Sequence, residues 1–126
     1  MEKMDIEKKM NPETMKDRTK QFAKQIIKLC RQMPNNREGR LIGDQLFRSG
    51  TSVASNYRAG CRARSRAEFI SKLGIVEEEA DEVLFWLEII NEIELLDQSL
   101  TAPLIKEGNE ILAIVVSSIN TARKNK

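Results

Sequence analysis

Four arginines that precede the third predicted helix are the clearest candidate for binding chemistry. Arg58, Arg62, Arg64 and Arg66 lie within nine residues that contain no acidic residue. A guanidinium group can bond two oxygens of one phosphate, and the first turn of a helix adds free amides and the positive end of its dipole. The cluster therefore predicts contact with nucleic-acid phosphates, largely independent of base sequence. The alternatives are a solvated loop, or arginines paired with an acidic helix of a neighbouring copy.

The segment that follows carries the opposite charge. Between Glu77 and Glu94 the chain has eight acidic residues and no lysine or arginine. Among these, Glu79 falls inside the apolar arc of a helical projection, where an unpaired carboxylate would be costly. We therefore expect a buried polar link that fixes helix register, with a small polar pocket around a carboxylate as the alternative. The predicted members of the link are Arg48, Ser49, Ser52, Asn56 and Glu79.

Residues for enzymatic chemistry are scarce. The chain has no histidine, which excludes Ser-His-Asp triads, Cys-His pairs and metal sites that need imidazole. Its two cysteines, Cys30 and Cys61, are 31 residues apart, so we expect reduced thiols and neither a disulfide framework nor a thiolate zinc site. A metal held by the helical carboxylates, as in a nuclease, is a minor alternative. We expect no catalytic residue, no cofactor and no metal.

Length and composition fit a single globular domain. The chain has 126 residues, of which 40% are hydrophobic, and 21 basic and 19 acidic residues give a net charge of +2. No stretch approaches 18 uncharged apolar residues, and the charged N-terminal segment has no apolar region typical of a signal peptide. We therefore expect a cytoplasmic protein that is not inserted in a membrane.

Apolar spacing and helix-boundary residues predict four helices joined by short turns. The first begins at Asn11 and stops at Pro34, and the second ends near Gly60. A Ser-Arg-Ala-Glu capping box at 65–68 begins the third, and the fourth begins near Thr101. We expect an all-α, antiparallel, up-down-up-down four-helix bundle. Its predicted parts are a flexible segment at 1–10, the bundle at 11–122 and a basic tail at 123–126.

The third and fourth helices carry more apolar surface than one bundle core needs. On a projection of about 100° per residue, the apolar arc of the third helix reaches roughly 220°, against a little over 100° for an ordinary surface helix. We therefore expect self-association, with a broad monomeric bundle as the alternative. Small residues of the second helix, Gly43, Gly50 and Ala54, are expected to admit a neighbouring helix. The predicted interface residues are Phe47, Ile75, Trp86, Ile89, Ile93, Ile105, Leu112, Val116 and Ile119.

The lysines of the first helix follow a strict spacing of four residues. Lys16, Lys20, Lys24 and Lys28 are most simply interpreted as a hydrated outer stripe.

The run from Leu46 to Gly60, LFRSGTSVASNYRAG, followed by Ser65, Phe69-Ile70 and an acidic helix, resembles the bacterial four-helix-bundle proteins encoded in 23S rRNA intervening sequences. The similarity spans roughly residues 15 to 122, and its specific part is the Arg-Ser-x-x-Ser-Val-x-x-Asn core. The resemblance implies an antiparallel bundle that assembles into a homopentameric barrel without known enzymatic activity. A related branch, the accessory proteins of diversity-generating retroelements, is similar and implies binding to nucleic acid and a reverse transcriptase. Family motif positions fall on Arg48, Ser49, Ser52, Val53, Asn56, Gly60 and Glu82.

The residues and the resemblance together predict a non-enzymatic, homo-oligomeric binding module. Its arginine cluster would hold RNA or DNA by the phosphates, and copies of the chain would add their clusters together. The alternative is a structural or protein-partner scaffold that does not bind nucleic acid. The expected partners are further copies of the chain, RNA or DNA, or another protein, and no membrane.

Overall fold

The computed structural model describes residues 11–125, and four α-helices form most of this range. The expected all-helical fold with four helices is confirmed, and no strand occurs within the described residues. The predicted flexible segment 1–10 lies outside them. The helices are α2 (Pro12–Cys30), α3 (Arg37–Cys61), α4 (Arg66–Glu92) and α5 (Gln98–Lys124).

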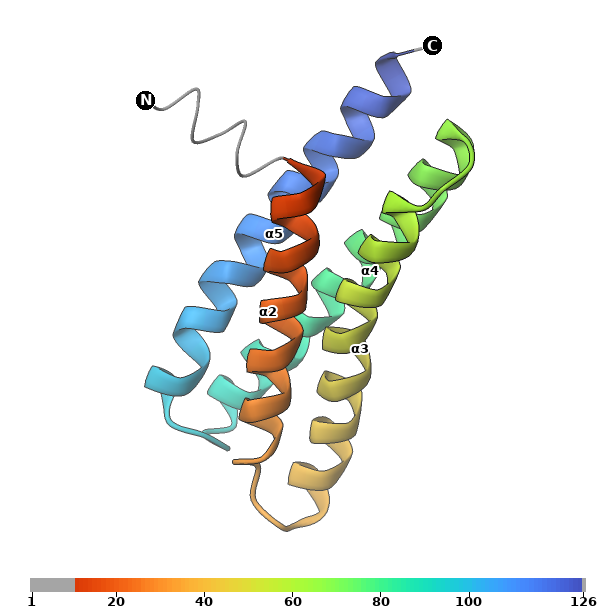
Figure 1. Ribbon diagram of the computed structural model, residues 1–126. Helices are drawn as coiled ribbons and strands as arrows, with labels where there is room; N and C mark the ends of the chain where they lie inside the picture. Colours follow the sequence, from red (N-terminus) through yellow and green to blue (C-terminus); the bar gives the residue numbers. More distant parts are fainter. Residues whose placement is uncertain (1–10, 126) are drawn as a thin grey trace.

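The helices pack side by side around one core (Figure 1). Each helix contacts the next one along the chain, and α5 also contacts α2, in the smallest of the four contacts. As a result α2 and α4 lie diagonally opposite one another. The upper end of the bundle contains the α3–α4 turn, the start of α2 and the last turns of α5. The lower end contains the α2–α3 turn and the α4–α5 turn. Along residues 11–125 no helix combines the length and apolar character that a membrane span requires.

The capping box predicted before α4 is present. Ser65 adopts extended backbone angles, and its hydroxyl accepts a hydrogen bond from the Glu68 amide at 3.0 Å. The Glu68 carboxylate accepts from the backbone amide of Arg64 at 3.1 Å, one residue before the serine. Both groups therefore cap amides in the first turn and in the turn that precedes it, which fixes where α4 begins.

The last helix begins earlier than the sequence prediction. Asp97 caps it by accepting from the Ser99 amide at 2.8 Å, so α5 starts at Gln98 and not near Thr101. Hydrogen bonds from the Ser99 side chain and backbone lower the pKa of Asp97. The buried hydroxyl of Thr101 donates to the Asn91 side chain, which ties α5 to α4. At the other end α5 continues to Lys124, so the expected boundary at residue 122 falls inside the helix.

The core is built from apolar side chains of all four helices. Close packing between α2 and α3 depends on the glycines of α3. A Cβ at Gly50 would lie 2.7 Å from Cγ2 of Ile26, and the Gly43 carbonyl accepts from Cys30, the last residue of α2, at 3.5 Å. The prediction that these glycines admit a helix of another copy is therefore wrong, because α2 of the same chain occupies that face.

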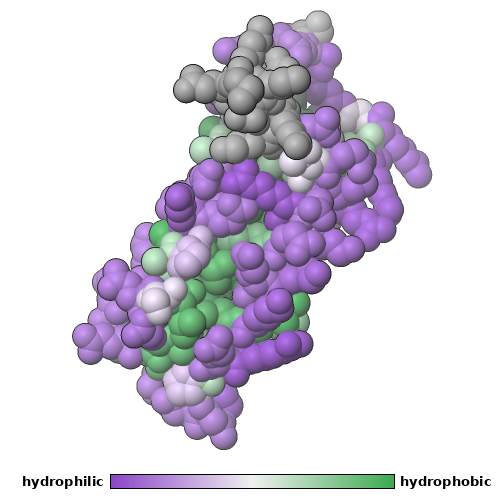
Figure 2. All heavy atoms as spheres, turned by 60° about the vertical axis from the view of Figure 1, so that its left-hand side comes forward, coloured by the Kyte–Doolittle hydropathy of each residue, from purple (hydrophilic) through white to green (hydrophobic). Residues whose placement is uncertain are grey.

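A salt bridge that the sequence analysis did not predict joins α2 to α5. Arg18 donates from Nε and from Nη2 to the two carboxylate oxygens of Glu107, each at 2.7 Å, and Nη2 also lies 3.4 Å from Glu110. The hydrogen bond with Glu107 is the main reason that the pKa of Arg18 is raised. Figure 2 looks onto this side of the bundle and shows that apolar surface lies exposed on the lower half, framed by polar side chains.

Candidate functional site

A recess beside the α3–α4 turn gathers most of the predicted arginine cluster. Arg58 and Arg62 come from the end of α3, Arg64 from the turn, and Lys72 from the second turn of α4. Glu68 also lines the recess, which has a volume of about 460 Å³. The recess thus has four cationic side chains and one carboxylate.

The four cations of this recess have no carboxylate partner among residues 11–125. The salt bridges of the described residues involve other side chains, and the Glu68 carboxylate accepts the Arg64 backbone amide. Unpaired cations in a concave surface raise the local positive potential and attract anions. The recess therefore has a surplus of positive charge among the described residues.

A second recess adjoins the first across Arg58 and Arg62. It has a volume of about 370 Å³ and is completed by the first turns of α2, with Lys16, Lys20, Glu13 and Asp17. Lys16 pairs with Glu13 at 3.1 Å. The interpretation of these two lysines as part of a merely hydrated stripe is therefore incomplete, because they share a recess with the arginines. The two recesses share Arg58 and Arg62 and therefore form one continuous cationic surface.

The fourth predicted arginine does not line either recess. Arg66 is the first residue of α4 and is exposed, and it lines neither recess. The structure therefore brings Arg58, Arg62 and Arg64 together and leaves Arg66 outside the group.

The tyrosine within the arginine segment belongs to the core. Tyr57 is 3% exposed, and burial, with a further contribution from Cys61, raises the pKa of its phenol. Cys61 itself is exposed, and partial burial is the main reason that the pKa of its thiol is raised. The buried Tyr57 ring is therefore not available to stack on a base.

The predicted polar link between α3 and α4 is present in part. Arg48 donates to Glu79 at 2.9 Å and to Glu82 at 2.5 Å, and Trp86 Nε1 donates to the same Glu82 oxygen at 3.3 Å. The Glu79 side chain is 16% exposed and that of Arg48 is 51% exposed, so the link joins a largely covered carboxylate to an exposed guanidinium group at the edge of the helix pair. The hydrogen bond with Glu82, followed by the charge of Glu79, raises the pKa of Arg48.

The other predicted members of the link do not reach the carboxylates. Ser49 donates to the Gln45 carbonyl at 2.9 Å, and Asn56 donates to the backbone and side-chain oxygens of Ser52. These groups are satisfied within α3, because hydroxyl and amide side chains in a helix readily bond the carbonyl four residues earlier. The prediction for Ser49, Ser52 and Asn56 is therefore wrong. Glu82 was missed as a member, although it lies three residues after Glu79 on the same helix face.

The predicted interface residues differ in exposure. Phe47 is 46% and Ile93 is 49% exposed, whereas Ile119 is 4% exposed and belongs to the core. Ile119 therefore cannot form part of an outer stripe, because α5 turns it toward the other helices. The sequence analysis omitted Phe85, which is 50% exposed. The remaining predicted residues are half-buried, namely Ile75, Trp86, Ile89, Ile105, Leu112 and Val116.

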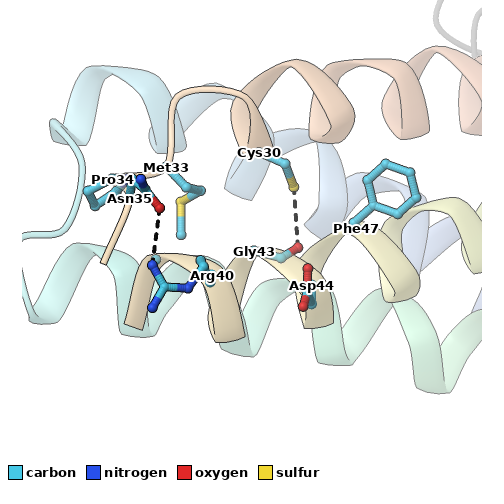
Figure 3. A pocket seen from close by; sticks show the side chains of 9 residues that line it. Cys30, Met33, Pro34, Asn35, Arg40, Gly43, Asp44 and Phe47 are labelled. Carbon is cyan, nitrogen blue, oxygen red and sulfur yellow. Dashed lines mark hydrogen bonds between the residues drawn. The ribbon is translucent and has the colours of Figure 1, made fainter. Parts of the chain in front are cut away.

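A pocket of about 240 Å³ lies at the α2–α3 turn, away from the arginines. Figure 3 shows the Cys30 thiol pointing from α2 to the Gly43 carbonyl, to which it donates at 3.5 Å, with Phe47 and Met33 on either side. Burial, with a smaller contribution from Asp44, raises the pKa of Cys30 to about 11. Burial therefore favours the protonated Cys30 thiol at neutral pH, and a protonated thiol is a poor nucleophile.

No group of three or more carboxylate or cysteine side chains within residues 11–125 is placed to hold a metal ion.

Three comparisons relate the chain to known proteins. Residues 14–117 match the family model of the 23S rRNA-intervening sequence protein. A crystal structure at 1.70 Å resolution of a protein of unknown function from the S23 ribosomal protein family of Bacteroides thetaiotaomicron VPI-5482 is similar, with a TM-score of 0.81 and 32% sequence identity. The similarity covers 86% of this chain and 97% of that one. Among curated proteins no match is found.

Proposed function

The chain belongs to the 23S rRNA-intervening sequence protein family, and we propose that it is a non-enzymatic, homo-oligomeric module that holds RNA or DNA by its phosphates. The observation that carries this proposal is the recess of Arg58, Arg62, Arg64 and Lys72, whose cations have no carboxylate partner among the described residues. Arginine suits this role because its planar guanidinium group bonds two phosphate oxygens at once.

The number of cations limits what one subunit can bind. The two recesses contain six lysine and arginine side chains and three carboxylates, so a subunit neutralises only a few phosphates. Each phosphate neutralised on duplex DNA contributes about 0.9 to the slope of log affinity against log salt. Useful affinity then requires several subunits on one nucleic acid, which is why self-association is part of the proposal. The family resemblance implies five copies.

A binding titration at several salt concentrations tests the proposal. A fluorescently labelled 20-base-pair duplex, as RNA and as DNA, is titrated with the protein between 50 and 200 mM salt, and anisotropy reports binding. We expect affinity to fall steeply with salt for both duplexes. The double substitution Arg62→Glu with Arg64→Glu should abolish most of the binding. The control is Arg37→Glu, which reverses one arginine at an exposed position of the lower end and should leave binding unchanged.

Two results would contradict phosphate binding. The first is a salt slope near zero, and the second is unchanged affinity in the double arginine variant while its circular dichroism remains that of the wild type.

A protein-partner scaffold is the second candidate function. It is favoured by the large apolar side chains that remain exposed, among them Leu41, Phe47, Phe85 and Ile93. Such side chains commonly mark protein contacts when they gather in one patch. This function predicts assembly that is insensitive to salt and no change in the anisotropy of either duplex.

A further inference from the structure

The surplus positive charge beside the α3–α4 turn is concentrated in one of the two recesses. The first recess, which we call the arginine recess, has four cationic side chains and one carboxylate, namely Arg58, Arg62, Arg64, Lys72 and Glu68. The second recess shares two of the arginines, and its other charged side chains are two lysines and two carboxylates of α2. Those four side chains bring no net charge. The surplus therefore does not extend from the arginine recess toward the start of α2.

Close packing of α4 on α3 brings the lysine of the arginine recess to its arginines. A Cβ at Gly60 would lie 2.8 Å from Cδ1 of Leu73 and 3.5 Å from Cβ of Lys72, so the start of α4 packs directly on the last turn of α3. Arg58 and Arg62 are four residues apart at the end of α3 and share one helix face. Cations of both helices therefore border one volume of about 460 Å³.

The carboxylate of the arginine recess is bonded to the backbone. Glu68 accepts from the Arg64 amide at 3.1 Å, and its own amide donates to the Ser65 hydroxyl at 3.0 Å. These two bonds fix the turn from which the Arg64 side chain leaves. The guanidinium groups of Arg58, Arg62 and Arg64 are exposed and have no carboxylate partner among residues 11–125. Their N–H groups are therefore available to an anion.

A terminal phosphate matches this concentration of charge better than a phosphate within a strand. A phosphodiester carries one negative charge and has two free oxygens. A phosphate monoester carries about two negative charges at pH 7 and has three strong acceptor oxygens. Several cations around one volume favour the more highly charged group, because the Coulomb energy grows with the product of the charges. A strand that crosses both recesses would need positive charge along its path, and the α2 side adds none.

We propose that the arginine recess binds the terminal phosphate monoester of a nucleic-acid strand in preference to the phosphates within the strand. Its arginine and lysine side chains supply the N–H donors for the three oxygens. Because the Tyr57 ring is buried and cannot stack on the last base, the preference should not depend on base identity. This inference rests on the proposed function, since it names the part of the nucleic acid that the same recess takes.

Duplexes that differ only at one strand end test the proposal. Three 20-base-pair RNA duplexes with an internal fluorophore carry a 5′-phosphate, a 3′-phosphate or only hydroxyl ends, and anisotropy measures the affinity of each. We expect a phosphorylated end to raise the affinity about tenfold, the effect of roughly one additional hydrogen bond between charged groups. A 21-base-pair duplex with hydroxyl ends is the charge control. It adds phosphates within the strands, and it should bind as the 20-base-pair hydroxyl duplex does.

Two matched double variants identify the recess responsible. Arg64→Gln with Lys72→Gln removes two cations that line only the arginine recess, and the tenfold preference should disappear. Lys16→Gln with Lys20→Gln removes two cations that line only the second recess. Each pair has one exposed and one half-buried side chain. The second variant should lower the affinity for every duplex alike and keep the preference. The preference is a ratio measured on one variant, so a general loss of folded protein does not change it.

Three results would overturn the proposal. The first is equal affinity for the hydroxyl duplex and both phosphorylated duplexes. The second is a preference that survives Arg64→Gln with Lys72→Gln, or that Lys16→Gln with Lys20→Gln removes equally. The third comes from competition with adenosine 5′-monophosphate and with inorganic phosphate. Displacement of the duplex by an equal concentration of either competitor would assign the recess to a free phosphate compound instead of a strand end.

The same titrations separate this inference from the proposed function. Salt-dependent binding that is equal for all strand ends would refute only the preference for a terminal phosphate. Absence of binding to every duplex would refute the proposed function itself.

Discussion

The substitution Gly50→Ala tests how tightly α2 is held against α3. The new Cβ would lie 2.7 Å from Cγ2, 3.0 Å from Cβ and 3.1 Å from Cγ1 of Ile26. Carbon atoms attract best at about 3.5–4.0 Å, so the contact is too short by on the order of 1 Å. Because the Ile26 Cβ is among the atoms approached, a rotamer change cannot relieve the clash, and α2 itself must move.

Two opposing contributions determine how much Gly50→Ala changes the free energy of unfolding. Overpacking of this kind costs about 2–3 kcal/mol, while replacing glycine by alanine inside a helix returns about 1 kcal/mol. We therefore expect the free energy of unfolding to fall by about 1–2 kcal/mol for Gly50→Ala. Gly74 is the matched control, because a Cβ there would meet no atom within 4 Å. Gly74→Ala should instead raise the free energy of unfolding by up to about 1 kcal/mol.

Urea denaturation followed by circular dichroism at 222 nm, at one protein concentration, measures both effects. Double variants identify the atoms responsible. Ile26→Val keeps all three contacted carbons and should not relieve the cost of Gly50→Ala, whereas Ile26→Ala removes two of them and should relieve most of it. The packing argument fails if Gly50→Ala is as stable as the wild type. It also fails if Ile26→Val relieves the destabilisation caused by Gly50→Ala as fully as Ile26→Ala does.

Two further predictions concern side chains that the sequence analysis did not place in contact. Arg18→Ala removes both hydrogen bonds to Glu107 and leaves that carboxylate partly buried without them. In the same urea assay the free energy of unfolding should therefore fall by about 1–2 kcal/mol. Arg18→Lys should recover only part of this loss, because lysine cannot make both bonds, and full recovery would contradict the two-bond geometry. Burial raises the pKa of Cys30 from its usual 9.0 to about 11, so its contribution to stability is complete below pH 9 and is lost as the pH rises through 11. Urea midpoints between pH 8 and 11 should therefore fall more steeply in the wild type than in Cys30→Ala, and equal slopes would refute the assigned burial effect.

Features that depend on a few adjacent residues were predictable from the sequence. The capping box of Ser65 and Glu68 lies within one helical turn, and Arg58 and Arg62 stay together because residues four apart share a helix face. The early start of α5 at Asp97 was also a local signal, since aspartate is a better N-cap than the threonine favoured by the sequence analysis.

Features that depend on how two helices meet were not predictable in this way. Lys20 of α2 shares a recess with Arg58 and Arg62, which depends on how α2 and α3 are placed against one another, and the glycines of α3 allow α2 to approach closely. The serines of α3 were predicted to reach Glu79, but the intrahelical carbonyl is nearer than any partner across the interface. Helical periodicity identifies the face on which a residue lies and leaves open which neighbour it meets.

The arginine recess and the exposed Ile93 lie at opposite ends of α4, which has a consequence for assembly. Lys72 lies near the start of this 27-residue helix and Ile93 directly after its end, so on the order of 30 Å separates them at 1.5 Å per residue. In a homo-oligomer of the kind proposed, copies related by rotation about an axis parallel to the helices would all present their arginines on one side. A long polyanion lying across that side would touch several copies at once, and the opposite side would remain free for another molecule.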